Sequence, residues 1–221
     1  MPARSAFRRF LSDLFAPAPR PRVRPLGGHL ERLDDRLVPA RVAVLGAASP
    51  DAWIADVEAK VVAAGVFAAD DVDTYNVYTS TITPAALAQY DSVLVFSDYG
   101  FMDPVGLGDM LADYVDAGHG VVLAAFGTAS VPLAGRWASG GYDPIAPTGQ
   151  SSSPTLALGG VAQPDHPVML DVTTFGGGTS SYRSAGGLTP GTELVASWSN
   201  GEPLVADRPG LGARVVGLNF Y

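Results

Sequence analysis

The stretch that decides the fold of this chain is LADYVDAGHGVVLAAFGTAS, Leu111 to Ser130. A helical pattern stops at Gly118, and an apolar strand pattern runs from residue 120 to Phe126. The chain then enters a small polar loop, Gly127 to Ser130. A helix followed directly by a buried strand is the building unit of α/β domains, and many α/β enzymes carry their nucleophile in the loop after such a strand. The stretch therefore predicts both the fold class and the place to look for a site.

The same alternation extends back to residue 41. Apolar strand patterns occupy residues 41–46, 72–79, 91–97 and 120–126, and helical patterns lie between them. Short, nearly continuous apolar strands separated by helices are typical of a parallel sheet covered on both faces. We therefore expect a doubly wound α/β domain, with mostly parallel strands.

Proline and capping residues predict where the helices begin. Each of three pairs combines a side chain that can cap with a proline suited to the first helical position: Ser49-Pro50, Thr83-Pro84 and Asp103-Pro104. The helix after Pro50 has an apolar face, which we expect to be buried, made of Trp53, Val57, Val61 and Ala64.

The amino-acid composition changes after Thr128. Residues 128–154 are rich in glycine, serine and proline and predict a long polar loop over the pocket edge. Strand patterns return at 155–160, 193–198, 203–208 and 213–221. The pair Asn200-Gly201 between two of them predicts a tight antiparallel hairpin near the C-terminus.

Composition excludes several kinds of chemistry. The chain has no cysteine, which rules out disulfides and a cysteine nucleophile. Residues 1–41 hold nine of the fourteen basic residues, so residues 42–221 carry a formal charge of −13. Such a charge repels phosphate backbones, and we expect no nucleic-acid partner. No apolar run approaches the ~20 residues of a membrane-spanning helix.

The first forty residues predict a flexible, basic and proline-rich segment. Residues 7–15 place Phe7, Phe10, Leu11, Leu14 and Phe15 on one helical stripe beside Arg8 and Arg9. Such a helix is suited to peripheral contact with an anionic membrane, and the alternatives are that it packs on the domain or frays. The segment HLERLDDRLVPA, residues 29–40, resembles the LExLEDR-type segment near the start of many surface or exported proteins of planctomycete bacteria. That resemblance implies export or association with the cell envelope. The alternatives are an ordinary connector and a cytoplasmic protein.

Three segments of residues 41–221 resemble the class I glutamine amidotransferase-like superfamily, most nearly its trehalose-utilisation-type and related noncatalytic branches. They are LADYVDAGHGVVLA, PDHPVMLDVTTFGGG and VASWSNGEPLVADRPGLGARVVGLNFY. The resemblance implies a flavodoxin-like three-layer sandwich with its pocket at the carboxyl edge of the sheet. Relatives continue beyond the last strand, so a shortened copy would leave an apolar patch beside that strand, suited to homo-oligomers.

Catalytic members of that superfamily carry a G-x-C-x-G elbow, whereas this chain reads FGTAS at residues 126–130. Glutaminase activity is therefore not expected. The resemblance places the loop containing His166 near the carboxyl edge. We take as candidate ligand-binding residues Ser49, Asp98, Tyr99, Thr128 and His166. No cofactor is implied, and Asp165, His166 and Asp171 do not make a metal set, since the first two are adjacent and no further ligand is supplied.

Two functions remain open. The first is a noncatalytic domain of an exported or envelope-associated protein that binds a small molecule, a glycan or a protein. The alternative is a hydrolase in which Thr128 or Ser130 is the nucleophile, with His166 and Asp98 in support. The second function requires the imidazole to lie within hydrogen-bond reach of a hydroxyl.

Overall fold

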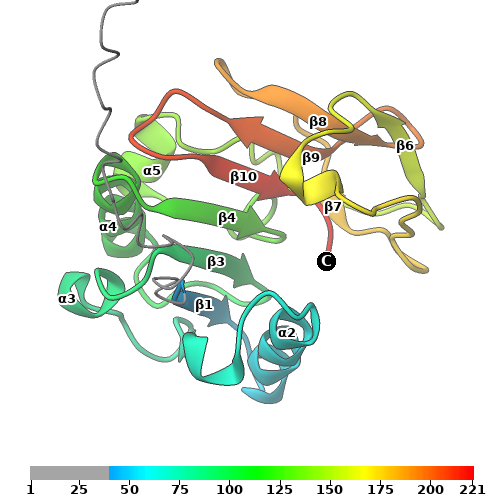
Figure 1. Cartoon of the computed structure of the whole chain (residues 1–221). Helices are drawn as coiled ribbons and strands as arrows, with labels where there is room; N and C mark the ends of the chain where they lie inside the picture. Colours follow the sequence, from blue (N-terminus) through cyan, green and yellow to red (C-terminus); the bar gives the residue numbers. More distant parts are fainter. Residues whose placement is uncertain (1–39) are drawn as a thin grey trace, which may run out of the picture. The chain divides into compact units, whose positions relative to one another are not determined.

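An eight-stranded sheet organises the part of the chain that the computed structural model describes, residues 40–221. Its strands lie in the order β2-β1-β3-β4-β10-β9-β8-β6 (Figure 1). Their bounds are β1 (Val42–Ala47), β2 (Val72–Asn76), β3 (Ser92–Ser97), β4 (Gly120–Ala124), β6 (Leu158–Val161), β8 (Glu193–Trp198), β9 (Pro203–Arg208) and β10 (Val215–Leu218). Two further strands, β5 (Gln150–Ser151) and β7 (Arg183–Ser184), form a small separate ladder.

Strand direction divides the sheet into two parts. The strands β2, β1, β3, β4 and β10 are parallel, whereas β9, β8 and β6 follow in antiparallel pairings. The expected hairpin joins β8 to β9, and its turn holds Gly201 at φ +91°. The mostly parallel sheet and the antiparallel hairpin are thus both confirmed.

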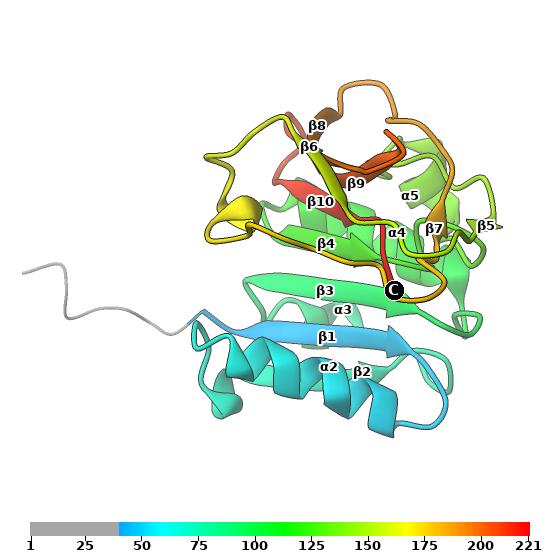
Figure 2. The same ribbon diagram turned by 90° about the vertical axis from the view of Figure 1, so that its right-hand side faces the viewer.

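Helices cover both faces of the sheet. The helix α2 (Ala52–Ala63) packs on one face, whereas α3 (Pro84–Leu87), α4 (Pro104–Asp116) and α5 (Gly135–Ser139) pack on the other (Figure 2). Alternate residues of each central strand therefore enter different cores. Val44 packs with Ile54 of α2, while Leu45 and Leu123 pack with Leu111 of α4. This three-layer α/β arrangement is the fold class that the sequence predicts.

Two of the three expected helix starts are confirmed. The hydroxyl of Thr83 accepts a hydrogen bond from the amide of Ala86, and the carboxylate of Asp103 accepts one from the amide of Gly106. The start at Ser49-Pro50 is wrong, because α2 begins at Ala52 with Asp51 as its N-cap residue. Trp53 thus stands in the exposed first turn of the helix, and Ile54 beside it faces the sheet.

The buried face of α2 therefore differs from the expectation. Ile54 is buried, and Val57 and Val61 pack beside it, but the side chains of Trp53 and Ala64 are exposed. Trp53 is 42% exposed. The prediction that this tryptophan belongs to the core is wrong.

The prediction of a long polar loop over residues 128–154 is also wrong. The segment contains α5, and its apolar side chains Leu133, Trp137, Tyr142 and Ile145 are all buried. The indole Nε1 of Trp137 donates a hydrogen bond of 2.7 Å to the carboxylate of Asp143. Glycine and proline content misled the prediction because the few large side chains of this segment carry the packing.

The face beside β10 is covered rather than bare. Met169, with Leu156, Val168 and Phe175, packs against Val216 and the neighbouring residues of β9 and β10. The expected apolar patch beside the last strand is therefore filled by the chain between β5 and β7. The association of copies that it suggested stays a prediction.

The side chain of Asn219 connects β7, β9 and β10 through hydrogen bonds. Its side-chain amide donates to the carbonyls of Ser184 and Pro203, and its side-chain oxygen accepts a hydrogen bond of 2.7 Å from the amide of Ser184. Asn219 is completely buried. One side chain thus ties three strands together.

The amphipathic helix expected over residues 7–15, the expected flexible segment and nearly all of the export-type segment 29–40 lie outside the described residues. Within residues 40–221, no helix has the length and apolar character needed to cross a bilayer.

Candidate functional site

The carboxyl ends of the five parallel strands meet at one edge of the sheet, and four predicted site residues lie on the loops that leave this edge. Ser49 follows β1, Asp98 and Tyr99 follow β3, and Thr128 follows β4. The amides of Asp98 and Tyr99 both donate hydrogen bonds of 2.9 Å to the carbonyl of Ala47, which fixes the loop after β3 against the end of β1. Ligands of open α/β sheets bind at this kind of edge.

The loop after β4 does not present an active hydroxyl. Thr128 is completely buried, and its Oγ1 has no hydrogen-bond partner. Ser130 is exposed, and its Oγ lies 3.5 Å from the side-chain oxygen of Gln150. An amide oxygen cannot accept a proton as a catalytic base does. The loop at the usual nucleophile position therefore holds two hydroxyl groups. That of Thr128 is buried, and that of Ser130 has no base beside it.

His166 is held in a different part of the molecule. Its Nε2 lies 3.3 Å from Oδ2 of Asp207, and its Nδ1 accepts a hydrogen bond from the amide of Val168. Nδ1 is therefore unprotonated, and Nε2 carries the proton that is donated to Asp207. The imidazole caps the short 3-10 turn Pro167–Met169 and fastens it to β9.

The register of the sheet shows how far this pair is from the loop after β4. Asp207 is paired with Val216, which in turn is paired with Val122 of β4. At ~4.8 Å per strand and ~3.3 Å per residue, Asp207 lies ~10 Å across the sheet and ~13 Å along it from the level of Phe126. The prediction that His166 lies at the carboxyl edge is therefore wrong. The structure does not bring Thr128, Ser130, His166 and Asp98 together.

Asp98 lies beside a different group. Partial burial together with the charge of Asp98 raises the pKa of Tyr221 above its usual value. The ring of Tyr221 stacks on Phe126 at a centroid distance of 5.0 Å. The loops after β3 and β4 and the residues after β10 are thus joined at the carboxyl edge.

Three exposed aromatic side chains lie together at this edge: Trp53, Tyr78 and Tyr99, here called the aromatic patch. The rings of Trp53 and Tyr99 are nearly parallel, with centroids 6.5 Å apart, and the ring of Tyr78 lies 5.2 Å from that of Tyr99. The three are 42%, 38% and 41% exposed. Only Tyr99 was a candidate from the sequence, because the helical pattern assigned Trp53 to the core and nothing local distinguished Tyr78.

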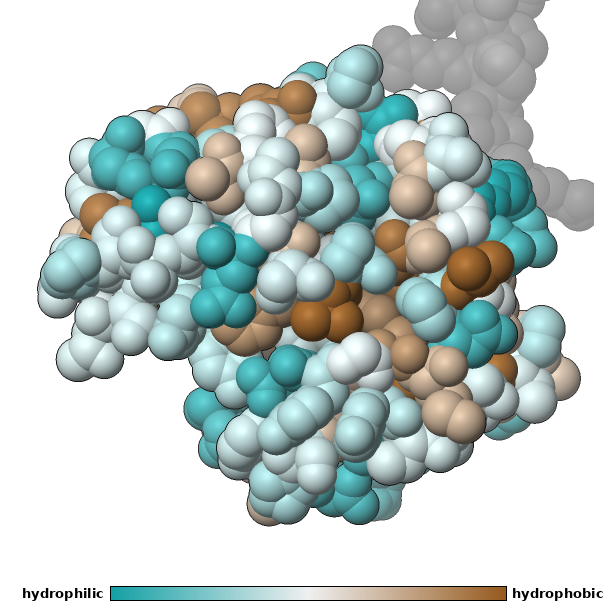
Figure 3. Space-filling model, turned by 180° about the vertical axis from the view of Figure 1, so that it is seen from behind, coloured by the Kyte–Doolittle hydropathy of each residue, from teal (hydrophilic) through white to brown (hydrophobic). Residues whose placement is uncertain are grey.

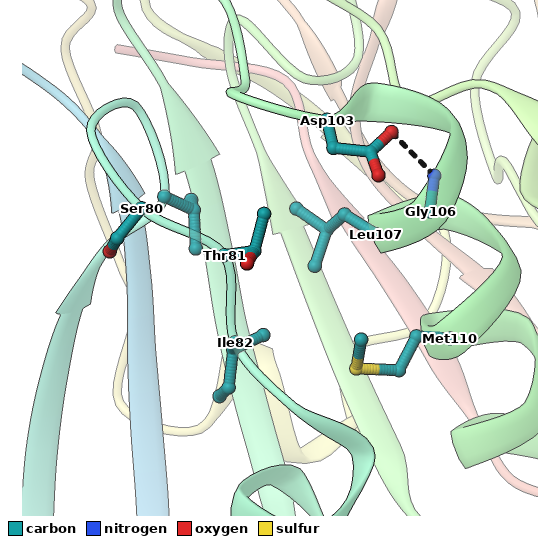
Figure 4. A pocket seen from close by; sticks show the side chains of 8 residues that line it. Ser80, Thr81, Ile82, Asp103, Gly106, Leu107 and Met110 are labelled. Carbon is teal, nitrogen blue, oxygen red and sulfur yellow. Dashed lines mark hydrogen bonds between the residues drawn. The ribbon is translucent and has the colours of Figure 1, made fainter.

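A pocket of about 200 Å³ lies on the side of the sheet that α4 covers (Figure 4). It lies between the segment after β2 and the first turns of α4, where Leu107 and Met110 point toward Ile82. The carboxylate of Asp103 at its rim accepts the capping hydrogen bond of 2.8 Å from Gly106. The pocket is therefore lined by polar and apolar groups in similar measure, and its carboxylate already caps the helix.

The surface and the acidic side chains restrict the kinds of ligand that the site can bind. On the face shown in Figure 3, hydrophobic side chains gather in a band between two largely hydrophilic regions. Among residues 40–221 there is no group of three or more histidine, aspartate or glutamate side chains suited to a metal ion. This edge offers aromatic, apolar and carboxylate groups to a ligand.

Comparison with known proteins rests on structure alone. No family model matches the chain, and no curated protein sequence matches it. The solved structure of a ThuA-like protein from Bacteroides uniformis superposes with a TM-score of 0.59 at 13% identity, covering 82% of this chain and 81% of that one. The two proteins share a fold. This agrees with the fold that the resemblance to the amidotransferase-like superfamily implies.

Larger proteins contain a similar domain. A β-galactosidase from Rahnella sp. R3 gives a TM-score of 0.51 at 14% identity, and this chain covers 29% of it. An exo-β-1,4-mannosidase from Opitutaceae bacterium strain TAV5 gives 0.51 at 9% identity, with 31% covered. At these identities the likeness concerns the fold, and it assigns no activity.

Proposed function

We propose that residues 41–221 form a noncatalytic amidotransferase-like domain that binds a small molecule at the carboxyl edge of the sheet. The observation that carries this proposal is that the loop after β4 has no activated nucleophile. The side chain of Thr128 is buried, and the hydroxyl of Ser130 faces an amide oxygen. Ligands of open α/β sheets bind outside the carboxyl ends of the strands, which makes this edge the expected place for a ligand. A glycan or a protein remains an alternative occupant of the same edge.

The geometry does not favour the hydrolase. A hydroxyl nucleophile needs a base within hydrogen-bond reach, and the imidazole of His166 is instead engaged at both nitrogens, with Asp207 and Val168. Asp98 lies beside Tyr221, whose pKa its charge raises. The residues expected to act together thus have separate partners.

A thermal-shift screen of the full chain tests the proposal. The compounds are neutral sugars, amino acids, nucleotides and amines. A ligand at 100 times its dissociation constant stabilises the folded state by about 2.7 kcal/mol. We expect Tyr99→Ala to abolish the shift and Asp165→Asn, an exposed carboxylate on the loop before His166, to leave it unchanged. A shift that survives Tyr99→Ala would place the ligand elsewhere, and a flat screen over a folded protein would contradict the proposal.

We further propose that the protein is exported or associated with the cell envelope. The support is the resemblance of residues 29–40 to the planctomycete LExLEDR-type segment. Fractionation of cells that produce the full chain is expected to find it in the envelope or outside the cell. Recovery from the cytosol alone would contradict this proposal.

A further inference from the structure

The charges around the aromatic patch are all of one sign. Asp98 precedes Tyr99 in the loop after β3, and Asp51 lies two residues before Trp53. The groups beside these carboxylates are neutral: the side-chain amide of Asn76 donates to Asp51, and the hydroxyl of Tyr221 lies near Asp98. Neither carboxylate is balanced by a cation in the described structure.

The basic side chains of residues 40–221 are engaged elsewhere. Three of them, Arg41, Lys60 and Arg136, form ion pairs with aspartates outside the carboxyl-edge loops. Arg183 and Arg214 pair with Glu202 and Asp207, and Arg208 donates to the carbonyl of Pro190. The carboxylates beside the aromatic patch thus lack a charged partner from this part of the chain.

Exposed aromatic rings next to unbalanced carboxylates form a surface that suits a positive charge. The faces of tryptophan and tyrosine rings carry negative partial charge and attract ammonium groups within ~6 Å of the ring centroid. A carboxylate at the edge of such a surface adds a Coulomb attraction that a neutral ligand does not feel. The raised pKa of Tyr221, caused by partial burial and by Asp98, reflects the same negative surroundings.

We propose that the aromatic patch binds the alkylammonium group of a small organic cation. This inference rests on the proposed function, since it names the ligand class of the same edge. The methyl or methylene groups of the cation would lie against the rings of Trp53 and Tyr99, and Asp98 would supply the opposite charge.

The three tryptophans provide a direct readout. Trp137 and Trp198 are completely buried, whereas Trp53 is 42% exposed. A ligand that stacks on the patch therefore changes the emission of one tryptophan and shields it from quenching by acrylamide. The probes are choline and its neutral carbon isostere, 3,3-dimethylbutan-1-ol, titrated into the full-length protein at constant ionic strength.

We expect choline to give a saturable change in emission and the neutral isostere to give none at the same concentrations. Tyr99→Leu keeps the bulk and removes the ring, and Asp98→Asn keeps the size of the side chain and removes the charge. Each is expected to raise the dissociation constant of choline about tenfold. The matched charge control, Asp165→Asn, is expected to leave it unchanged.

The outcomes separate this inference from the proposed function. If the isostere binds as well as choline and Tyr99→Leu weakens both, the edge is a ligand site but does not select a cation. Choline binding that neither Tyr99→Leu nor Asp98→Asn weakens would overturn the assignment of the patch. If choline, the isostere and the compounds of the thermal-shift screen all fail to affect the folded protein, both proposals are wrong.

Discussion

Asp143 is the buried carboxylate whose charge bears most directly on stability. Burial raises its pKa to about 7, against a smaller opposite effect of the hydrogen bond from Trp137. Because the pKa is higher in the folded than in the unfolded chain, the folded state binds more protons between pH 4 and pH 7. The contribution of Asp143 to stability is therefore favourable at low pH and is lost as the pH rises through that window.

Asp143→Asn is expected to remove this pH dependence, because the asparagine oxygen still accepts the hydrogen bond of Trp137 and carries no charge. Above pH 7 the variant should be more stable than the natural chain by up to about 4 kcal/mol, from 1.36 kcal/mol per pKa unit. Urea unfolding between pH 4 and pH 8 measures the difference. Parallel stability curves for the two proteins would show that Asp143 is ionised in the folded state at all these pH values.

Asn219 gives a second prediction at the residue scale. Asn219→Ala would leave backbone groups of Ser184 and Pro203 buried without partners, at an expected cost of about 3 kcal/mol. Asn200→Ala is the control, since Asn200 accepts one hydrogen bond in an exposed turn and its loss should cost about 1 kcal/mol or less. Denaturant titration of both variants checks the difference, and equal losses would contradict the role of Asn219 as a clamp.

Among the elements, the α4–α5 contact depends on a glycine. An added Cβ at Gly108 would lie 2.1 Å from the carbonyl oxygen of Ala134, so the two segments approach too closely for any side chain. Gly108→Ala is expected to destabilise by about 2 kcal/mol, although alanine is the better helix former by about 1 kcal/mol. Val105→Ala, exposed on the same helix, should stay within about 0.5 kcal/mol. Thermal unfolding compares the two, and a stabilised Gly108→Ala would show that the segments can separate at little cost.

Local signals explain why some elements could be predicted and others could not. Thr83-Pro84 and Asp103-Pro104 fix helix starts through contacts within four residues, so the sequence is sufficient there. The helix α5 has five residues and exists because Trp137 is buried among distant parts of the chain. Pattern reading cannot detect such an element, since its stability is tertiary.

The site was predictable only where it follows the parallel strands. Asp98, Tyr99 and Thr128 were placed correctly because each follows a strand whose direction the alternating pattern implies. His166 was misplaced because its partner, Asp207, lies on an antiparallel strand, and the sequence does not show which part of β9 faces that loop. Trp53 was misplaced because the adjacent Ile54 takes the buried position in the first turn of α2, and the apolar pattern does not distinguish the two.

Over the whole molecule, the histidine and the aromatic patch occupy separate regions, and we expect them to respond independently. His166→Ala leaves the buried carboxylate of Asp207 with Arg214 as its remaining partner. The expected cost is about 3 kcal/mol of stability, with no change in the choline dissociation constant. Unfolding and fluorescence titration of the same variant measure both quantities. Loss of choline binding by the folded variant would show that the two regions are coupled.

The position of β10 has a consequence for how the chain reaches this structure. β10 is the last strand in sequence, yet it lies between β4 and β9. Val121 must find Val215, 94 residues further on, before the parallel and antiparallel parts can join. Until the ribosome has made β10, β4 and β9 therefore each have one unpaired hydrogen-bonding edge that other chains can pair with. The middle of this sheet is synthesised last, and the nascent protein is most exposed to aggregation just before its synthesis reaches that strand.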